Sequence, residues 1–321
     1  MKLIELYIEN FGGLSQYSLD FEEFLTARGY RKEQLEELYG NLVESRSFGD
    51  VVNGTFERLF LDYVTLGGMP EVVERYFLRG TFEGTLAIQR RIISDYRSDV
   101  RKYAEGLDPQ RIVGVFESIP AQLAKENKKF QLSCVEKNAR YKDYWGCVEW
   151  LNDAGIVNIC KMMDFPELPI IAHLNAAKYK LYMADSGLML SMLDEESQED
   201  IRVRRDLGTW KGGFFENIIA EALVKAGATL AYHKKENSTL EMDFFLRSGE
   251  CLVPVEVKST NGKSKSMRTM LDSEHYKDIK WGIKLVRGDV GFNDGILTIP
   301  QWCAFMLPRL LKDKGAGYSF K

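Results

Sequence analysis

The sequence predicts a multidomain chain of mixed α+β or α/β class, and three observations carry that prediction. The chain has 321 residues, which is enough for two or three domains. Helical spacing of apolar residues dominates residues 66–200. In residues 201–321, a helical segment is followed by three strand-like segments, a second helix and another strand, which is the order typical of an α/β domain.

Composition and charge exclude several classes of protein. The hydrophobic fraction of 45% and the charged fraction of 28% are ordinary for a globular protein. The N-terminus lacks the pattern of a signal peptide, and no apolar run reaches the length of a membrane span, so we expect a cytoplasmic protein without membrane contact. The five cysteines form no CxxC pair and the three histidines are isolated, which argues for reduced thiols and against a zinc site. A net charge of −4 argues against bulk electrostatic coating of nucleic acid but leaves room for a local basic groove.

The N-terminal segment, residues 1–65, starts with a strand pattern. Apolar and polar residues alternate from the first residue up to Gly12 and Gly13, which predicts a strand followed by a turn. Residues 21–45 then show the apolar spacing of a helix with charges on its other face.

The middle segment, residues 66–200, is predicted to be mostly helical. An Asp108-Pro109 pair predicts the start of one helix. Residues 139–163 read as an amphipathic helix, an Asp-Ala-Gly turn and an apolar strand. A further strand then leads to a helix capped by Asp185 or Ser186. A short helix, a second helix and a strand pair are the parts of a winged helix.

The helix that follows residue 139 is a candidate DNA-reading helix. Arg140 and Lys142 lie at its start, where such helices meet a groove of DNA, so we name them as candidate nucleic-acid contacts. Contact with a partner protein is an equal alternative, because the winged-helix shape also serves as a protein-binding module. Trp145 and Trp150 are expected to pack in the core.

The last segment, residues 201–321, contains an unusual pair of charged strands. Ser248-Gly249 is a turn signal, and a two-residue loop there would place Asp243 opposite Pro254, with Glu256 as its diagonal neighbour. Side chains two residues apart on a strand share a face. Asp243, Glu256 and Lys258 are therefore expected to point the same way.

These charged residues suit metal-dependent phosphodiester chemistry. Asp243 and Glu256 would bind one Mg²⁺, which prefers oxygen ligands. Lys258 would orient an attacking water, and Glu216 on the preceding helix would add a carboxylate to the site. The competing interpretation is a solvated strand on which the Glu-x-Lys pair is a weak surface ion pair.

A positive cluster follows the Glu-x-Lys motif. Lys263 and Lys265 lie within a few residues of Lys258, together with Arg268. Contact with the phosphates of a nucleic acid is one interpretation. A solvated helix start explains the same residues equally well.

Several stretches also carry a family resemblance. The segments "FENIIAEAL", "EMDFFL" and "PVEVKST" resemble the PD-(D/E)XK nuclease-like domain. Residues 66–321 are similar to the C-terminal region of unknown function in a family of bacterial and archaeal AAA-type ATPases, through stretches such as "GGMPEVV" and "YKDYWGCVEWLNDAGIV". The resemblance implies a winged-helix domain over residues 66–200 and a restriction-endonuclease-like α/β domain over residues 201–321. It also implies that the catalytic residues are Glu216, Asp243, Glu256 and Lys258.

The phosphate-binding loop of those ATPases does not occur in this sequence. The best fragment, Gly262-Lys263-Ser264, has Val257 where the first glycine of G-x-x-x-x-G-K-[ST] belongs. We therefore expect neither ATP binding nor ATP hydrolysis, and interpret residues 1–65 as a truncated remnant of an ATPase module. Two functions stay open: a Mg²⁺-dependent DNA endonuclease, or a DNA- or protein-binding accessory module without catalysis.

Overall fold

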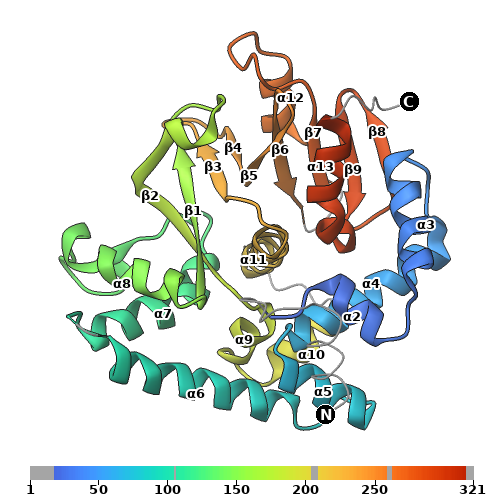
Figure 1. Cartoon of the computed structure of the whole chain (residues 1–321). Helices are drawn as coiled ribbons and strands as arrows, with labels where there is room; N and C mark the ends of the chain where they lie inside the picture. The colour runs from blue at the N-terminus through green and yellow to red at the C-terminus, as the bar shows by residue number, and fades with distance from the viewer. Residues whose placement is uncertain (1–17, 105, 204–208, 259–261, 316–321) are drawn as a thin grey trace. The chain divides into compact units, whose positions relative to one another are not determined.

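The computed structural model describes residues 18–104, 106–203, 209–258 and 262–315 (Figure 1). The strand expected near Gly12 lies outside these residues. The helices of the described residues are α2 (Phe21–Ala27), α3 (Lys32–Val43), α4 (Gly49–Leu66), α5 (Pro70–Arg79), α6 (Thr85–Tyr103), α7 (Pro109–Leu123), α8 (Tyr141–Asp153), α9 (Ser186–Ser191), α10 (Glu196–Arg202), α11 (Thr209–Lys225), α12 (Lys265–Leu271) and α13 (Leu307–Gly315). Short 3₁₀ turns are η1 (Leu132–Cys134), η2 (Ile170–His173) and η3 (Gln301–Met306). None of the described helices combines the length and the apolar character that a membrane crossing needs.

Within the described ranges the strands form two sheets, and both sheets mix parallel and antiparallel pairs. The strands are β1 (Val157–Met163), β2 (Leu174–Met183), β3 (Ala231–Lys234), β4 (Glu241–Met242), β5 (Phe244–Ser248), β6 (Cys251–Val257), β7 (Gly282–Val286), β8 (Gly291–Asn293) and β9 (Ile296–Pro300). One sheet has the order β2-β1-β3-β4 and the other the order β5-β6-β7-β9-β8. The predicted mixed α+β class is confirmed.

The chain divides into two compact units, each built from separate stretches of sequence. The first unit draws on residues 1–30, 58–158 and 181–221, and the second on residues 31–57, 159–180 and 222–321. The division at residues 65 and 200 that the sequence suggested stays a prediction.

The first unit is largely helical. Helix α6 packs against α5, α7 and α9, and α7 packs against α8. Two helix starts expected from the sequence are confirmed by their capping bonds. The carboxylate of Asp108 accepts a hydrogen bond from the Gln110 amide at 2.9 Å, and that of Asp185 accepts one from the Leu188 amide at 2.9 Å.

The helical spacing of residues 21–45 corresponds to two helices in the structure. Helix α2 ends at Ala27 and α3 begins at Lys32. Between them Gly29 has a φ of +97°, a left-handed conformation that glycine adopts without steric cost. The glycine therefore lies where the first helix ends.

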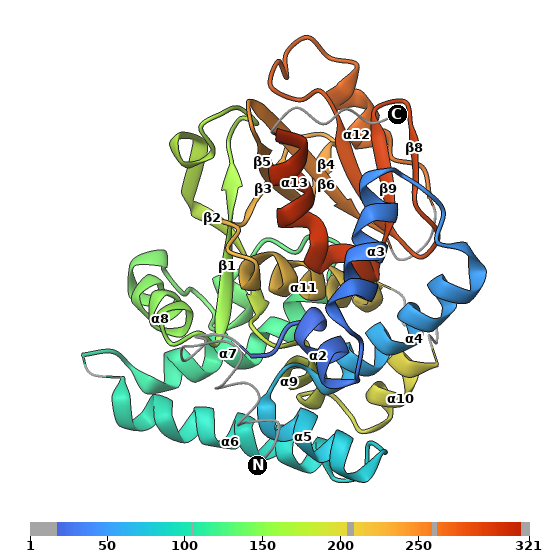
Figure 2. The ribbon, with the colours of Figure 1, turned by 45° about the vertical axis from the view of Figure 1, so that its right-hand side comes forward.

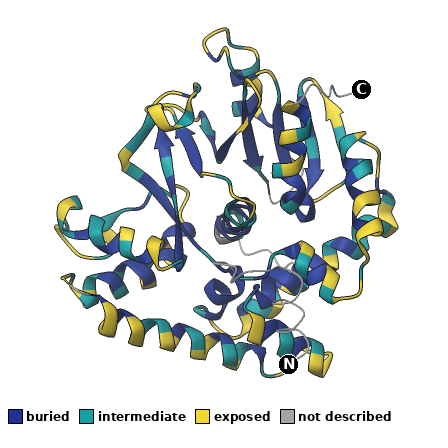
Figure 3. Cartoon of the chain, in the orientation of Figure 1, coloured by how far each residue is buried: buried dark blue, intermediate teal, exposed yellow. Residues whose placement is uncertain are grey.

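In the second unit, the five-stranded sheet has a helix on each face. A Cβ added to Gly282 on β7 would lie 2.7 Å from the Met267 sulfur of α12 and 3.1 Å from Pro254, so α12 covers the face that carries Pro254. On the other face, the Ser248 hydroxyl donates a hydrogen bond to the Leu311 carbonyl of α13 at 2.7 Å. Both helices can be followed in Figures 1 and 2, and Figure 3 shows the inner strands as mostly buried.

The register of β5 and β6 corrects the predicted pairing. The loop is Gly249-Glu250 rather than Ser248-Gly249, and Phe245, not Asp243, lies opposite Pro254. The observed register is shifted by two residues from the predicted one. Because side chains alternate with a period of two, a shift of two residues keeps every side chain on its predicted face.

Asp289 anchors the start of helix α4 within the second unit. Its carboxylate accepts hydrogen bonds from the Phe48 amide at 2.9 Å, from the Gly49 amide at 3.2 Å and from the Ser47 hydroxyl. Burial alone would raise the pKa of Asp289, but these hydrogen bonds outweigh it and lower the pKa to about 2. The ionised carboxylate is therefore bound more tightly in the folded protein than in the unfolded chain.

We expect Asp289→Asn to lower the free energy of unfolding at pH 7 by about 1 kcal/mol, the usual size of a lost helix-cap bond. The folded pKa lies below the unfolded one, so the ionised carboxylate stabilises the fold fully above pH 4 and loses its effect as the pH falls toward 2. Urea unfolding of both proteins from pH 7 to pH 2 measures this, with the exposed Asp272→Asn as the matched control. A difference that stays constant across this range would contradict the assignment.

Candidate functional site

Asp243 lies where the chain passes from β4 to β5. It belongs to neither strand, and its carboxylate accepts a hydrogen bond from the Val257 amide at 2.8 Å. Because Phe244 pairs with Val255, Asp243 is next in line to face Glu256. The structure thus brings Asp243 beside the Glu-x-Lys motif of β6, as the sequence predicted.

Glu256 is a buried acid near the end of β6. Only 6% of its surface is exposed, and its Oε1 lies 2.8 Å from the Lys258 Nζ. Its Oε2 is buried and has no hydrogen-bond partner among the described residues. A buried carboxylate oxygen without a protein partner is costly unless another donor or a cation binds it, so this oxygen is a candidate ligand. The solvated-strand interpretation of this motif therefore does not fit Glu256.

Lys284 is a residue of this site that sequence reasoning missed. It lies on β7 directly beside Glu256, and it is only 8% exposed. Burial lowers the pKa of Lys284; the Glu256 carboxylate partly opposes this, while Lys258 and Arg268 lower the pKa further. The signal was present in the segment "GIKLV", where one lysine interrupts an apolar strand in the way that Glu256 interrupts β6.

A cationic pocket of about 430 Å³ adjoins this cluster. Its cationic lining side chains are Lys263, Lys265, Arg268 and Lys284, and none of the described lining residues is acidic. Its remaining lining residues are Gly262, Ser264, Asn293, Ile296 and Thr298. The structure thus gathers Lys263 and Lys265, two of the predicted nucleic-acid contacts, into one pocket.

Glu216, the fourth predicted catalytic residue, belongs to the first unit. It is 3% exposed on α11 and forms an ion pair with the Lys128 ammonium. The Tyr182 hydroxyl donates to its Oε2 at 3.1 Å. One residue further along α11, the Asn217 side chain bonds both the amide and the carbonyl of Met183. These polar contacts join α11 to β2 and to the loop before η1, which is a structural reason for burying the carboxylate.

Arg140 and Lys142 also lie in the first unit, at the start of α8. Both are exposed, and the Arg140 guanidinium lies 2.8 Å from the Asp143 carboxylate. The expectation that Trp145 and Trp150 are core residues is wrong, since both are only half-buried. The aromatic residue that α8 does bury is Tyr144, at 2% exposure, with its hydroxyl 2.5 Å from the Glu136 carboxylate.

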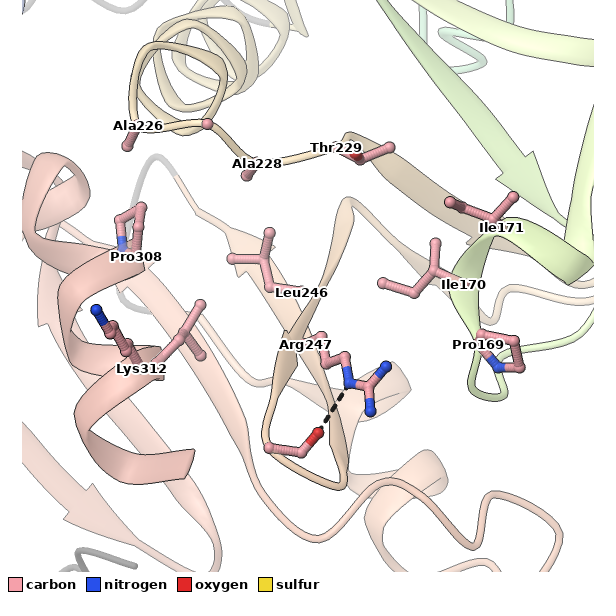
Figure 4. Close-up of a pocket in the computed structure, with 13 residues that line it drawn as sticks. Pro169, Ile170, Ile171, Ala226, Ala228, Thr229, Leu246, Arg247, Pro308 and Lys312 are labelled. Atoms are coloured by element: carbon pink, nitrogen blue, oxygen red, sulfur yellow. Dashed lines mark hydrogen bonds between the residues drawn. The ribbon is translucent and has the colours of Figure 1, made fainter. Parts of the chain in front are cut away.

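A second pocket, of about 420 Å³, lies elsewhere in the second unit and has a different chemistry (Figure 4). Apolar side chains, among them Ile170, Leu246 and Pro308, form most of its walls, with Arg247 and Lys312 as its charged residues. The Arg247 Nε already donates to the Gly249 carbonyl at 2.8 Å. Within the described residues, it contains no buried polar atom that lacks a partner.

The donor set around Glu256 fits one hard divalent cation. Asp243 and Glu256 supply carboxylate oxygens, the ligands that Mg²⁺ prefers, and Glu256 Oε2 is unused. Nowhere in the described ranges do three or more His, Cys, Asp or Glu side chains come together as a metal-binding group. A cation here would therefore keep water or a substrate oxygen in its remaining positions, as Mg²⁺ commonly does.

Comparisons with known proteins match two parts of the chain. Residues 57–199 match the model of a domain of unknown function, DUF8612. Residues 211–303 match that of another, DUF4143. No curated protein and no solved structure matches this chain. The chain is thus similar, over the residues that carry Asp243, Glu256 and Lys258, to a domain of unknown function often found in proteins associated with AAA-type ATPases.

Proposed function

We propose that this chain is a DNA-associated accessory protein whose residues 201–321 form a PD-(D/E)XK nuclease-like domain with Mg²⁺-dependent phosphodiesterase activity. In this proposal, residues 66–200 form a winged-helix domain that contacts DNA through Arg140 and Lys142. The observation that carries the proposal is the buried Glu256 carboxylate, which has one unpartnered oxygen and lies beside Asp243, Lys258 and a cationic pocket.

Each residue of the site has a role that its placement supports. Asp243 and Glu256 would hold the cation, which polarises a phosphodiester and lowers the pKa of a bound water. The Lys258 ammonium, 2.8 Å from Glu256, would position that water and offset the negative charge that develops during attack. Glu216 is proposed only as an assisting carboxylate, because its contacts with Lys128 and Tyr182 already account for its burial.

The cationic pocket supports a polyanionic substrate in spite of the chain's negative net charge. A net charge of −4 gives weak long-range attraction to DNA. Binding would then depend on local contacts between phosphates and Lys263, Lys265 and their neighbours in the pocket. The pocket also lies beside Glu256 through Lys284, so a bound phosphate would be held close to the proposed cation.

One observation favours the second candidate, a DNA- or protein-binding module without catalysis. The Lys258 ammonium is paired with Glu256, and the Asp243 carboxylate is bonded to the Val257 amide, so each already has a partner within the fold. A site that had lost its chemistry would keep such contacts for stability. The two candidates differ in whether a divalent cation produces cleavage.

A cleavage assay with plasmid and linear DNA tests the proposal. We expect cleavage in MgCl₂ and none in EDTA. We expect Lys258→Met to lower the rate by about 10²-fold or more, as removal of one transition-state donor does. Lys277→Gln, an exposed lysine of the same unit, is the matched control and should keep the wild-type rate. DNA binding with no cation-dependent cleavage under any of these conditions would instead support the non-catalytic module.

A further inference from the structure

Two polar residues of the cationic pocket are buried in a way that surface lysines are not. Lys284 is 8% exposed and Ser264 is 5% exposed, and both line the pocket. The Ser264 hydroxyl oxygen is buried without a hydrogen-bond partner among the described residues. A buried hydroxyl without a partner, in a pocket lined by concentrated positive charge, indicates a site built for an anionic ligand.

The charge of the pocket selects among anions. Lys263, Lys265, Arg268 and Lys284 concentrate positive charge around a volume of about 430 Å³. Two acidic side chains lie near this lining: Glu256 is beside Lys284, and Asp294 lies 3.8 Å from Arg268 in a pair whose side chains are both exposed. An internal phosphodiester carries a single negative charge, whereas a terminal phosphate monoester carries about −1.5 to −2 at pH 7. The more highly charged group neutralises this lining better.

The depth of the pocket favours the same choice. Lys284 and Ser264 are both more than nine-tenths buried as residues, and the Ser264 hydroxyl oxygen is itself buried. An internal phosphate is flanked by a sugar on each side, so the strand holds it at the surface of a groove. A terminal phosphate has one free side and can enter a pocket end-on to reach such groups.

We propose that the pocket formed by Lys263, Ser264, Lys265, Arg268 and Lys284 binds the terminal phosphate of a nucleic-acid strand. The inference deepens the proposed function and takes its class of ligand from it. It makes Lys284 a specificity-determining residue, because this residue is the most buried of the four cationic residues that line the pocket and pairs directly with Glu256 on the neighbouring strand. The protein would then act on strands that already carry a phosphorylated end, placed next to the proposed cation site.

Equilibrium binding in EDTA tests this without any need for cleavage. The probes are two trithymidylates that are identical except for a 5′-phosphate or a 5′-hydroxyl, and inorganic phosphate serves as competitor. We expect the phosphorylated strand to bind about tenfold more tightly or better, which corresponds to one charge-assisted contact. We expect inorganic phosphate to compete with the 5′-phosphate and so to reduce the difference in affinity between the two strands. Equal affinity for the two strands overturns the inference.

Two sets of variants locate the contact. Lys284→Gln should abolish the preference for the phosphorylated strand. Since Lys284 is buried, the exposed pair Lys265→Gln/Arg268→Gln provides a second variant that leaves the core unchanged, and it should reduce the preference as well. Lys277→Gln removes one exposed charge outside the pocket and should retain the full preference. A preference that survives in both pocket variants contradicts this location.

The outcomes separate this inference from the proposed function. If the protein prefers the phosphorylated strand but never cleaves DNA, the assignment of the pocket as a terminal-phosphate site is supported. The proposed phosphodiesterase activity is then contradicted. If the protein cleaves DNA in a Mg²⁺-dependent way but shows no such preference, the proposed phosphodiesterase activity is supported. The assignment of the pocket as a terminal-phosphate site is then contradicted. An inorganic-phosphate effect of equal size in wild type and Lys284→Gln means that any binding occurs elsewhere, and it counts against the inference.

Discussion

Glu256→Gln is expected to lower the rate of Mg²⁺-dependent DNA cleavage by about 10³-fold or more, the largest effect of any single substitution in the second unit. The carboxamide has nearly the same shape as the carboxylate but carries no charge, so it is a poor ligand for a hard cation. The substitution also takes the anionic partner away from Lys258, whose Nζ lies 2.8 Å from Glu256 Oε1. The loss of a cation ligand and the loss of the partner of Lys258 both act at the reacting phosphate.

The matched control for this variant is Glu250→Gln. Glu250 lies in the turn of the same β5–β6 hairpin and is exposed, so it tests loss of a negative charge without loss of the site. We expect it to cleave at the wild-type rate. Circular dichroism of both variants should show wild-type folding. A Glu256→Gln protein that folds and retains the wild-type rate would remove Glu256 from the catalytic site.

Lys128→Met is expected to have the largest effect on stability, lowering the free energy of unfolding by about 3 kcal/mol. The Glu216 side chain is only 4% exposed and that of Lys128 16%, so the ion pair between them is largely shielded from water. Removing the ammonium leaves a buried carboxylate that keeps the hydrogen bond from the Tyr182 hydroxyl but has lost this counterion. The cost is the desolvation of a charge that no longer has its counterion.

A double variant distinguishes this cause from loss of packing. Lys128→Met/Glu216→Gln removes both charges, and it should recover most of the stability that Lys128→Met loses. The exposed Lys137→Met should change the unfolding free energy little. Urea unfolding monitored by circular dichroism measures all four proteins. A double variant as unstable as the single one would show that the lysine stabilises the unit by packing alone.

Features set by local chemistry were predictable from the sequence. The helix starts at Pro109 and Ser186 follow from capping aspartates, which act within one turn of the chain. The hydrogen bond between the Asp243 carboxylate and the Val257 amide agrees with the hairpin that the sequence pattern predicts. The period of two along a strand explains why the predicted face survived an error of two residues in the loop.

Features set by distant parts of the chain were not predictable in this way. The hairpin register depends on whether Gly249-Glu250 or Ser248-Gly249 forms the turn, and both pairs satisfy turn preferences. Lys284 joined the site only because β7 pairs with β6 in parallel, a contact between residues 28 positions apart (256 and 284). The spacing of residues along the sequence does not show which strands pair. The same is true of the Lys128 partner of Glu216.

In the proposed function, Asp243 and Glu256 hold one divalent cation beside Lys258. A crystal structure of the protein grown with Mn²⁺, in which the anomalous signal locates the metal, tests it most directly. We predict one Mn²⁺ bonded to carboxylate oxygens of both Asp243 and Glu256 at on the order of 2 Å, with Glu256 Oε2 among its ligands. Well-ordered Asp243 and Glu256 side chains at saturating Mn²⁺, with no anomalous peak between them, would contradict the claim.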